Sequence, residues 1–205
     1  MSKILGRSFY DRSPLIVARE IIGKKLVRTR NDGVVLSGII VEAEAYAGNK
    51  DPASHAYRGK TPRNEVMFGE AGHAYVYFTY GFHHCLNFVT SSRYGKASAV
   101  LIRAAEPTSG IEEMKVRRKT NAITNLASGP GKLCQAFLID RSLNGVDVTH
   151  ENSPIRVEDT SLNSNIGVSA RVGIRQASDR MWRFYSKASP HVSKSRESIR
   201  AGRES

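Results

Sequence analysis

The segment 34–46 (VVLSGIIVEAEAY) carries the strongest structural signal in the sequence. Its aliphatic and β-branched residues, placed directly after the turn residues 31–33 (NDG), predict a long strand. Successive side chains of a strand point to opposite faces, so Glu42, Glu44 and Tyr46 should share one face. Glutamate is rarely buried unless it is paired. We therefore interpret this acidic face either as a solvated surface or as the floor of a site.

The other patterned segments predict an α+β fold. Strand-like and helix-like segments do not alternate as in a βαβ chain, which favours a mixed or antiparallel sheet. Pro14 and Gly23 mark the start and end of one predicted helix, and Ser109 with Glu112 predicts a capping box for another. The expected helices span 14–22, 110–119 and 128–139, and the expected strands span 24–30, 34–46, 73–90 with a hinge near Tyr80-Gly81, 97–107, 154–159, 170–174 and 182–186.

The excess of basic residues predicts a polyanionic partner. The chain has 31 Lys and Arg against 19 Asp and Glu, a formal net charge of +12. Nucleic acid is the first candidate, an anionic membrane surface is the second, and a merely solvated basic surface is the plain alternative. We find no apolar run of about 18 residues and no secretory signal. We therefore expect no membrane partner and an intracellular protein, cytoplasmic or nucleoid-associated in a prokaryote and nuclear in a eukaryote.

The length of 205 residues favours a single domain. We expect it to cover residues 1–192, followed by a basic and loose tail over 193–205. Cys85 and Cys134 fit two buried thiols of a reducing compartment better than a disulfide. Segment 47–70 is rich in Gly, Pro, Asn and charged residues, and it predicts a long ordered loop. Loops of this length in compact domains usually have a function.

Common catalytic and metal-binding motifs are not found in the sequence. Residues 59–61 (GKT) resemble the end of a P-loop, but Ser54 stands where the leading glycine is required. Residues 83–85 (HHC) resemble a metal site, yet adjacent side chains of a strand face opposite ways. No second ligand pair follows at a zinc-site spacing. We therefore expect neither a metal nor a cofactor.

The aromatic residues of segment 73–90 suggest a way to contact nucleic-acid bases. Tyr75 and Tyr77 share a strand face, and Tyr80 precedes Gly81, which can adopt the positive φ of a tight turn. Core packing is the plain explanation for such tyrosines. On a basic surface, however, exposed aromatic side chains stack on bases or wedge between them. Together, the charge and the aromatics favour a nucleic-acid partner.

Six separate motifs, in this order along the chain, stand out together. They are VEAEAYAGNKDPASHAYRGKTPRNEVMF, YVYFTYGFHHCLNFVT, VLIRAAEP, SGPGKLCQA, ARVGI and WRFYSKASPHVS. The series resembles the alkyladenine DNA glycosylase family, the mammalian type of 3-methyladenine DNA glycosylase, over about residues 7–193. The resemblance implies a single mixed α/β domain with a curved, largely antiparallel sheet, surrounding helices and a protruding β-hairpin.

The resemblance also implies an activity. Members of this family are monofunctional glycosylases of base excision repair, acting as monomers on damaged double-stranded DNA without metal or cofactor. We expect this chain to flip alkylated or deaminated purines out of the duplex, in the class of 3-methyladenine, 7-methylguanine, hypoxanthine and ethenoadenine. Flipping is needed because the reacting atoms cannot be reached inside the duplex. Hydrolysis of the N-glycosidic bond would then leave an abasic site.

Catalytic and pocket residues carry over from the family by position. Glu44 matches the carboxylate that activates water, and Arg103 matches the arginine near that water. An opposite charge nearby lowers the pKa of a carboxylate, so Arg103 is expected to keep Glu44 ionised and oriented. Tyr46 and His55 match one wall of the base pocket, and Tyr77 matches the opposing wall.

The remaining site residues concern specificity and DNA contact. Asn87 matches the pocket asparagine that disfavours the exocyclic amino group of guanine. Tyr80 matches the tyrosine that enters the duplex where the flipped nucleotide leaves. Arg63 and Lys132 are candidates for contacts with the DNA backbone, and Lys132 lies at a helix start, where ordinary capping is an equal explanation. Glu42 is a candidate partner of the catalytic carboxylate from the same strand face.

Three other functions stay open at the level of sequence. A non-catalytic module that stacks bases on the hairpin would explain the charge and the tyrosines, but it leaves the acidic strand face without a purpose. A nuclease would need a cluster of metal-binding carboxylates, which the sequence does not present. A combined glycosylase and lyase would need a nucleophilic lysine, and no lysine of the chain stands out as one.

Overall fold

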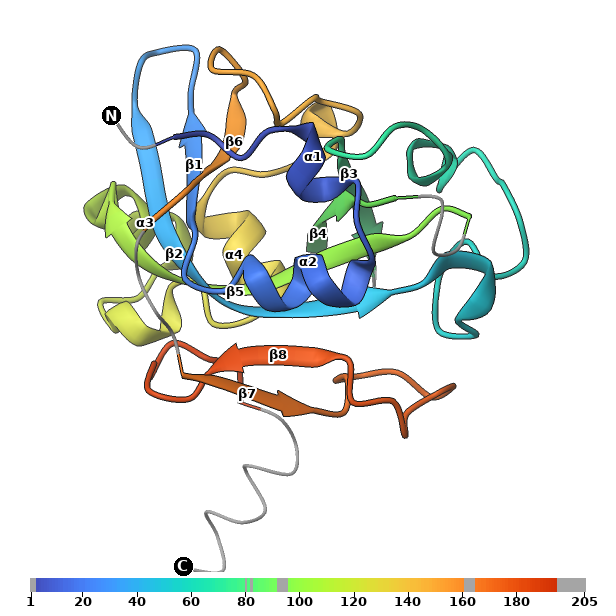
Figure 1. The fold of residues 1–205 in the computed structure, drawn as a ribbon. Coiled ribbons are helices and arrows are strands. Elements are labelled where there is room, and N and C mark those ends of the chain that lie inside the picture. Colours follow the sequence, from blue (N-terminus) through green and yellow to red (C-terminus); the bar gives the residue numbers. More distant parts are fainter. Residues whose placement is uncertain (1–2, 80, 82, 92–95, 161–164, 195–205) are drawn as a thin grey trace, which may run out of the picture.

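The computed structural model describes residues 3–79, 81, 83–91, 96–160 and 165–194 of the chain. They form one curved antiparallel sheet with short helices packed around it (Figure 1), which confirms the predicted fold class. The sheet has the order β3-β4-β5-β2-β1-β6, and β8 pairs with β2 and β7. The strands are β1 (Lys25–Thr29), β2 (Val35–Tyr46), β3 (Ala74–Thr79), β4 (His83–Val89), β5 (Ala99–Ser109), β6 (Ile155–Glu158), β7 (Ile166–Ser169) and β8 (Arg183–Ser186).

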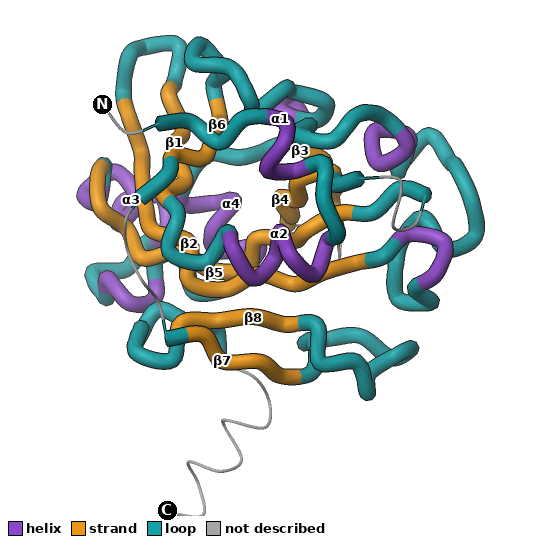
Figure 2. Tube along the Cα trace, viewed as in Figure 1, coloured by secondary structure: helices purple, strands orange, loops and turns teal. Residues whose placement is uncertain are grey.

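In the described part of the chain, short α-helices and 3-10 turns pack around the sheet (Figure 2). The helix predicted from Pro14 is α2, and it buries Val17 and Ala18 against β2 and β5. The α-helices are α1 (Arg7–Tyr10), α2 (Pro14–Glu20), α3 (Ile111–Arg118) and α4 (Pro130–Ala136), and the 3-10 turns are η1 (Gly48–Lys50), η2 (Glu65–Phe68), η4 (Ile123–Asn125) and η5 (Arg141–Leu143). Among the described residues, no helix combines the length and the apolar character needed to cross a membrane.

The central strand β2 is sharply curved (Figure 1). Its pairing with β5 shifts register between Ser37 and Gly38 and on both sides of Glu42. Bulges of this kind bend a strand and increase its twist. The first part of β2 pairs with β1 along its other edge, whereas residues Glu42 to Glu44 pair with β8 on that edge. The bend therefore brings β8, from the far end of the chain, next to the acidic residues.

The two faces of the sheet around β2 have different roles. Ala43 and Ala45 of β2 point into the main core, where they meet alternate residues of β3, β4 and β5 such as Val76, Leu86 and Ile102. The residues in between point to the opposite face, as the two-residue period of a strand requires. That opposite face carries Glu42, Glu44 and Tyr46 together, as the sequence predicted.

The hairpin of β3 and β4 forms where the sequence predicted it. Gly81 has a φ of +76° and open space around it, which suits the tight turn at the tip. Tyr80, the predicted wedge residue, lies outside the described residues. The described chain extends to Lys194, and Ser193, the first residue of the predicted tail, is only 8% exposed. The folded part therefore includes a residue that the sequence assigned to the tail.

Two local predictions are wrong. Segment 170–174 is not a strand, and the strand that pairs with β8 is β7, formed by earlier residues. Ser109 does not cap α3, because the N-cap is Gly110, which has a φ of +74° and would place a Cβ 2.3 Å from Leu36 Cδ2. The capping box fails because Ser109 is still part of β5 and donates its hydroxyl to the Val35 carbonyl.

Candidate active site

The pocket lies on the sheet face that does not form the main core. Its volume is about 230 Å³, below the roughly 300–1,000 Å³ of typical sites for drug-sized ligands, which favours a compact ligand such as one base. Segments outside the sheet close the pocket with residues 53–55, Met67, Pro130 and residues 172–174. The sheet contributes alternate side chains of four strands, namely Tyr46, Tyr75, Tyr77, Thr79, Cys85, Asn87, Leu101 and Arg103.

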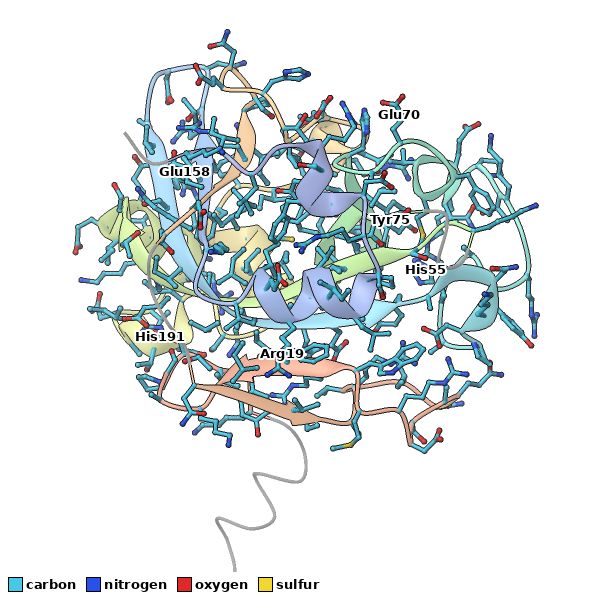
Figure 3. All side chains as sticks on the ribbon, in the orientation of Figure 1. Arg19, His55, Glu70, Tyr75, Glu158 and His191 are labelled. Carbon is cyan, nitrogen blue, oxygen red and sulfur yellow. The ribbon has the colours of Figure 1, made fainter. Side chains whose placement is uncertain are left out.

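The aromatic residues group differently from the prediction. His55 lies against Tyr77, with ring centres 4.5 Å apart at an interplanar angle of 76°, and its Nδ1 is 3.0 Å from the Tyr75 hydroxyl (Figure 3). A base held between two faces needs about 7 Å, twice the contact distance of carbon atoms. No base fits between His55 and Tyr77 at this spacing. These residues therefore form one wall, which leaves Tyr46 as the candidate for the opposing wall.

His55 is neutral at physiological pH. Although the residue as a whole is exposed, its ring lies against those of Tyr75 and Tyr77, with ring centres 6.2 Å and 4.5 Å away. Loss of hydration disfavours the charged form, and the positive charge of Arg63 disfavours it further, so that the pKa of His55 falls to about 4. Burial likewise raises the pKa of Tyr75 to about 12. This wall of the pocket is therefore polar but uncharged.

The Glu44 carboxylate lies directly behind the pocket lining and is 0% exposed. Oε2 accepts a hydrogen bond from the Tyr46 hydroxyl at 2.9 Å, and Oε1 accepts one from the Val172 backbone N–H at 2.8 Å. Nη1 of Arg103 is 3.3 Å from Oε1. All three partners line the pocket. Burial, together with the negative charge of Glu44, holds the pKa of Tyr46 well above its usual value, so the phenol keeps the proton that it donates.

Glu42, two residues earlier, is also 0% exposed and is held by more partners. Oε1 accepts from Nε of Arg103 and Nε of Arg183, each at 2.7 Å, and from the Ser193 hydroxyl at 2.8 Å. Oε2 accepts from the Ser193 backbone N–H at 2.7 Å. Burial alone would raise the pKa of Glu42, but the charges of Arg103 and Arg183 outweigh it and lower the pKa. The buried acid is therefore an ionised and fully engaged carboxylate.

A second buried ion pair supports Tyr46 from behind. Nη1 and Nη2 of Arg171 lie 2.5 Å and 2.9 Å from the two carboxylate oxygens of Asp51, and neither side chain is exposed. The Arg171 guanidinium also lies 4.6 Å from the centre of the Tyr46 ring and 5.1 Å from that of Trp182. Such stacking of a cation on an aromatic face is favourable when both are desolvated. Asp51 and Arg171 thus fix the position of one pocket wall.

Other predicted residues lie at the pocket or near it. Asn87 is 4% exposed, lines the pocket and donates from Nδ2 to the Tyr75 carbonyl at 3.0 Å. Arg63 is engaged by the hairpin, with Nη2 donating to the Phe78 carbonyl at 3.1 Å and the guanidinium 5.3 Å from the Tyr77 ring centre. Its observed contacts therefore tie the loop over 47–70 to β3.

Lys132 lies in α4, two residues after the pocket residue Pro130. Its ammonium contacts Oδ1 of Asn125. Partial burial lowers the pKa of Lys132, and the positive charges of Arg118 and Lys194 lower it further.

The sequence features that resembled a metal site do not gather ligands. Cys85 and Cys134 are both buried free thiols, as predicted. Cys85 lines the pocket, whereas Cys134 belongs to the main core. Within the described part of the chain, no three His, Cys, Asp or Glu side chains converge in a way that could hold a metal ion.

Four site residues from the last quarter of the chain, and Asp51 in the loop over 47–70, were missed by the sequence analysis. Val172, Arg171, Arg183 and Ser193 all come from the C-terminal quarter of the chain and reach β2 through the pairing of β8 or the segments next to it. Val172 acts through its backbone, which leaves no trace in side-chain chemistry. The arginines could have been suspected, because two buried carboxylates require cationic partners.

Known proteins resemble this chain along nearly its whole length. A family model described as methylpurine-DNA glycosylase (MPG) matches residues 8–190. A protein from Carboxydothermus hydrogenoformans is 50% identical over 198 residues, covering 93% of this chain and 99% of its own length. One from Methanocella arvoryzae is 50% identical over 195 residues, covering 93% and 96%. Both carry the name "Putative 3-methyladenine DNA glycosylase".

A third relative, from Prosthecochloris aestuarii, has the same name and is 48% identical over 189 residues, covering 92% of this chain and 90% of its own. Coverage of this extent includes every strand that builds the pocket. The chain therefore belongs to the methylpurine-DNA glycosylase family, enzymes of DNA repair that hydrolyse the N-glycosyl bonds of damaged bases.

Proposed function

We propose that this enzyme flips alkylated or deaminated purines, in the class of 3-methyladenine, 7-methylguanine, hypoxanthine and ethenoadenine, out of duplex DNA and releases them with a water activated by Glu44. The observation that carries the proposal is the Glu44 carboxylate, fully buried directly behind an aromatic pocket and held by three pocket residues. An abasic site would remain in the strand. We further propose that the enzyme works as a monomer and acts where cellular DNA is found.

The contacts of Glu44 suit a general base. A carboxylate has about four lone-pair positions, and the described residues engage three of them. Oε2 receives only the Tyr46 hydroxyl among these contacts, and we propose that the attacking water binds this oxygen from the side of the pocket. As the base departs, the sugar becomes electron-deficient, as in glycoside hydrolysis generally. The carboxylate would stabilise this charge and accept a proton from the attacking water.

Arg103 would orient that carboxylate through its charged contact with Oε1. The Arg103 guanidinium contacts both buried acids. Burial alone would lower the pKa of Arg103, but the negative charges of Glu44 and Glu42 outweigh this effect and raise it. Arg103 also lines the pocket, where it lies next to the expected path of the water. Arg103 therefore keeps its own proton, and the proton that Glu44 accepts would come from the attacking water.

The walls of the pocket would hold the extruded base by stacking. Base–aromatic stacking contributes about 1–3 kcal/mol per base, similar to the few kcal/mol needed to unstack a nucleotide. Damaged pairs are easier to open, so selection can begin with flipping. A positively charged alkylated purine would gain a further attraction to the rings of Tyr46 and Tyr77. Asn87, which lines the pocket, is proposed to test the exocyclic group of the base.

Contact with the duplex would involve the hairpin and the cations beside the pocket. Tyr80, which precedes Gly81 in the sequence, is proposed to fill the space left by the flipped nucleotide and so delay its return. Lys132 and its neighbours are proposed to meet the phosphate backbone, as is Arg63 from the loop over 47–70. Phosphate contacts of this kind orient the enzyme without reading sequence.

The test is the substitution Glu44→Gln, assayed by single-turnover release of hypoxanthine from a duplex oligonucleotide. General-base catalysis is worth about 10²–10⁴ in rate, and the variant is expected to lose at least that factor while binding the duplex as tightly as the wild type. Glu70→Gln is the matched control, because its side chain is 75% exposed at the surface. Excision by a folded Glu44→Gln protein at the wild-type rate would disprove the assignment.

A further inference from the structure

Ser193 connects the C-terminal segment to the catalytic side of the sheet. The segment follows β8, and Ser193 is 8% exposed. Its backbone N–H and its hydroxyl donate to different oxygens of Glu42, at 2.7 Å and 2.8 Å. Nη2 of Arg183 donates to the Ser193 carbonyl at 3.3 Å. Every polar group of this residue is therefore directed at the buried charge network rather than at its own local turn.

The network fixes the orientation of Arg103. Nε of Arg103 donates to Glu42 at 2.7 Å, and Nη2 lies 3.4 Å from the Ser193 hydroxyl. The guanidinium is planar, so two fixed nitrogens determine the direction of the third. That third nitrogen, Nη1, lies 3.3 Å from Oε1 of Glu44. Glu42 and Ser193 thus hold one edge of Arg103 and leave its other end directed at the carboxylate behind the pocket.

We propose that Ser193 is a positioning residue for base excision, acting through Glu42 and Arg103 on Glu44. This inference rests on the proposed role of Glu44 as the general base. Ser193 does not contact the pocket itself, since the pocket lining contains Arg103 but neither Glu42 nor Ser193. The Ser193 hydroxyl donates to Oε1 of Glu42, which also accepts from Arg103 and Arg183. It thereby helps to hold the Glu42 carboxylate in a fixed orientation.

A hydrogen-bond partner behind a catalytic group can affect rate without affecting binding. At metal sites, where this has been measured, loss of an outer partner commonly changes activity or affinity by about 10–100-fold. The same reasoning applies to an arginine that must face a buried carboxylate within tenths of an ångström. Loss of the Ser193 hydroxyl would let the guanidinium rotate about its fixed Nε. The excision step would be slowed, whereas the DNA-contacting surface would be unchanged.

The experiment compares Ser193→Thr with Ser193→Val, which have nearly the same shape and differ in the hydroxyl. Ser193→Ala serves as a third variant with less steric change. Single-turnover release of hypoxanthine is measured at saturating enzyme, and duplex affinity is measured separately in the Glu44→Gln background, where the substrate persists. Ser189→Ala is the matched control, because Ser189 lies in the same segment and contacts Glu106 rather than Glu42.

We expect Ser193→Val and Ser193→Ala to excise about tenfold more slowly than wild type, with duplex affinity within twofold, and Ser193→Thr and Ser189→Ala to stay near the wild-type rate. Equal rates for the Thr and Val variants would overturn the proposal, as would a loss of affinity that accounts for the slower rate. If Glu44→Gln is inactive while Ser193→Val excises normally, only the role of Ser193 is lost. If Glu44→Gln excises normally, the proposed function itself is lost.

Discussion

Tyr46 donates its phenolic hydrogen to Oε2 of Glu44 over 2.9 Å, so that a wall of the pocket also holds the carboxylate behind it. The two residues are two positions apart on β2 and share a face. Tyr46 would therefore both stack on the extruded DNA base and orient Glu44, the proposed general base. The substitution of Tyr46 allows these two roles to be separated.

Tyr46→Phe keeps the aromatic ring and removes the hydrogen bond to Glu44. A hydrogen bond to a charged group contributes about 1.5–3 kcal/mol, so we expect the single-turnover excision rate to fall by about tenfold or more. Duplex affinity should change little, because the ring remains. Tyr57→Phe, on the exposed part of the loop over 47–70, is the control. A Tyr46→Phe enzyme with the wild-type rate would show that this bond does not orient the carboxylate.

Asp51→Asn tests the support behind Tyr46. Removing one partner of a buried ion pair leaves the other charge uncompensated, and this destabilises a protein by about 3–5 kcal/mol. Arg171 and Asp51 are both fully buried, so we expect a loss of this size in the free energy of unfolding measured with urea. Glu112→Gln removes an exposed pair with Lys115 and should leave the unfolding midpoint unchanged. Similar midpoints for both variants would contradict the structural role of the buried pair.

His55 should make stability depend on pH in the weakly acidic range. Its pKa is about 4 in the folded protein and about 6.5 in an unfolded chain. Between these values the unfolded state binds the proton first, so stability falls as the pH is lowered from about 6.5 towards 4. Because His55 is an exposed residue, we expect this slope to be shallow.

The check is urea unfolding of wild type and His55→Gln between pH 7 and pH 5. The variant should show a smaller loss of stability over this interval. A residual slope is expected from His191, because burial lowers its pKa as well. His150→Gln is the comparison, since that side chain is 71% exposed. Identical slopes for His55→Gln and wild type would argue against an enclosed, neutral His55.

Lys132→Gln should weaken duplex binding in a salt-dependent way. A lysine that neutralises one phosphate contributes about one unit to the slope of log affinity against log salt. We expect that slope to fall by about one for Lys132→Gln, with similar losses for damaged and undamaged duplexes. Lys25→Gln, on β1, provides the comparison. An unchanged salt slope would remove Lys132 from the proposed DNA surface.

The sequence alone determined a good part of this protein. The alternation in segment 34–46 placed Glu42, Glu44 and Tyr46 on one face, and the structure confirms it, because the two-residue period of a strand is a local property. The turn glycine Gly81 likewise located the hairpin. Local chemistry also suggested Ser109 as a helix cap, and here the pairing of β5 prevailed over it.

The tertiary structure decided what the acidic face does. Whether Glu44 meets water or a pocket depends on the bulges that bend β2 and on the docking of β8, which no local pattern encodes. The partners Val172 and Ser193 lie about 130 to 150 residues away in sequence and act partly through their backbone. Burial of two carboxylates is stable only because distant arginines and N–H groups reach them, and such long-range contacts arise only when the whole sheet is assembled.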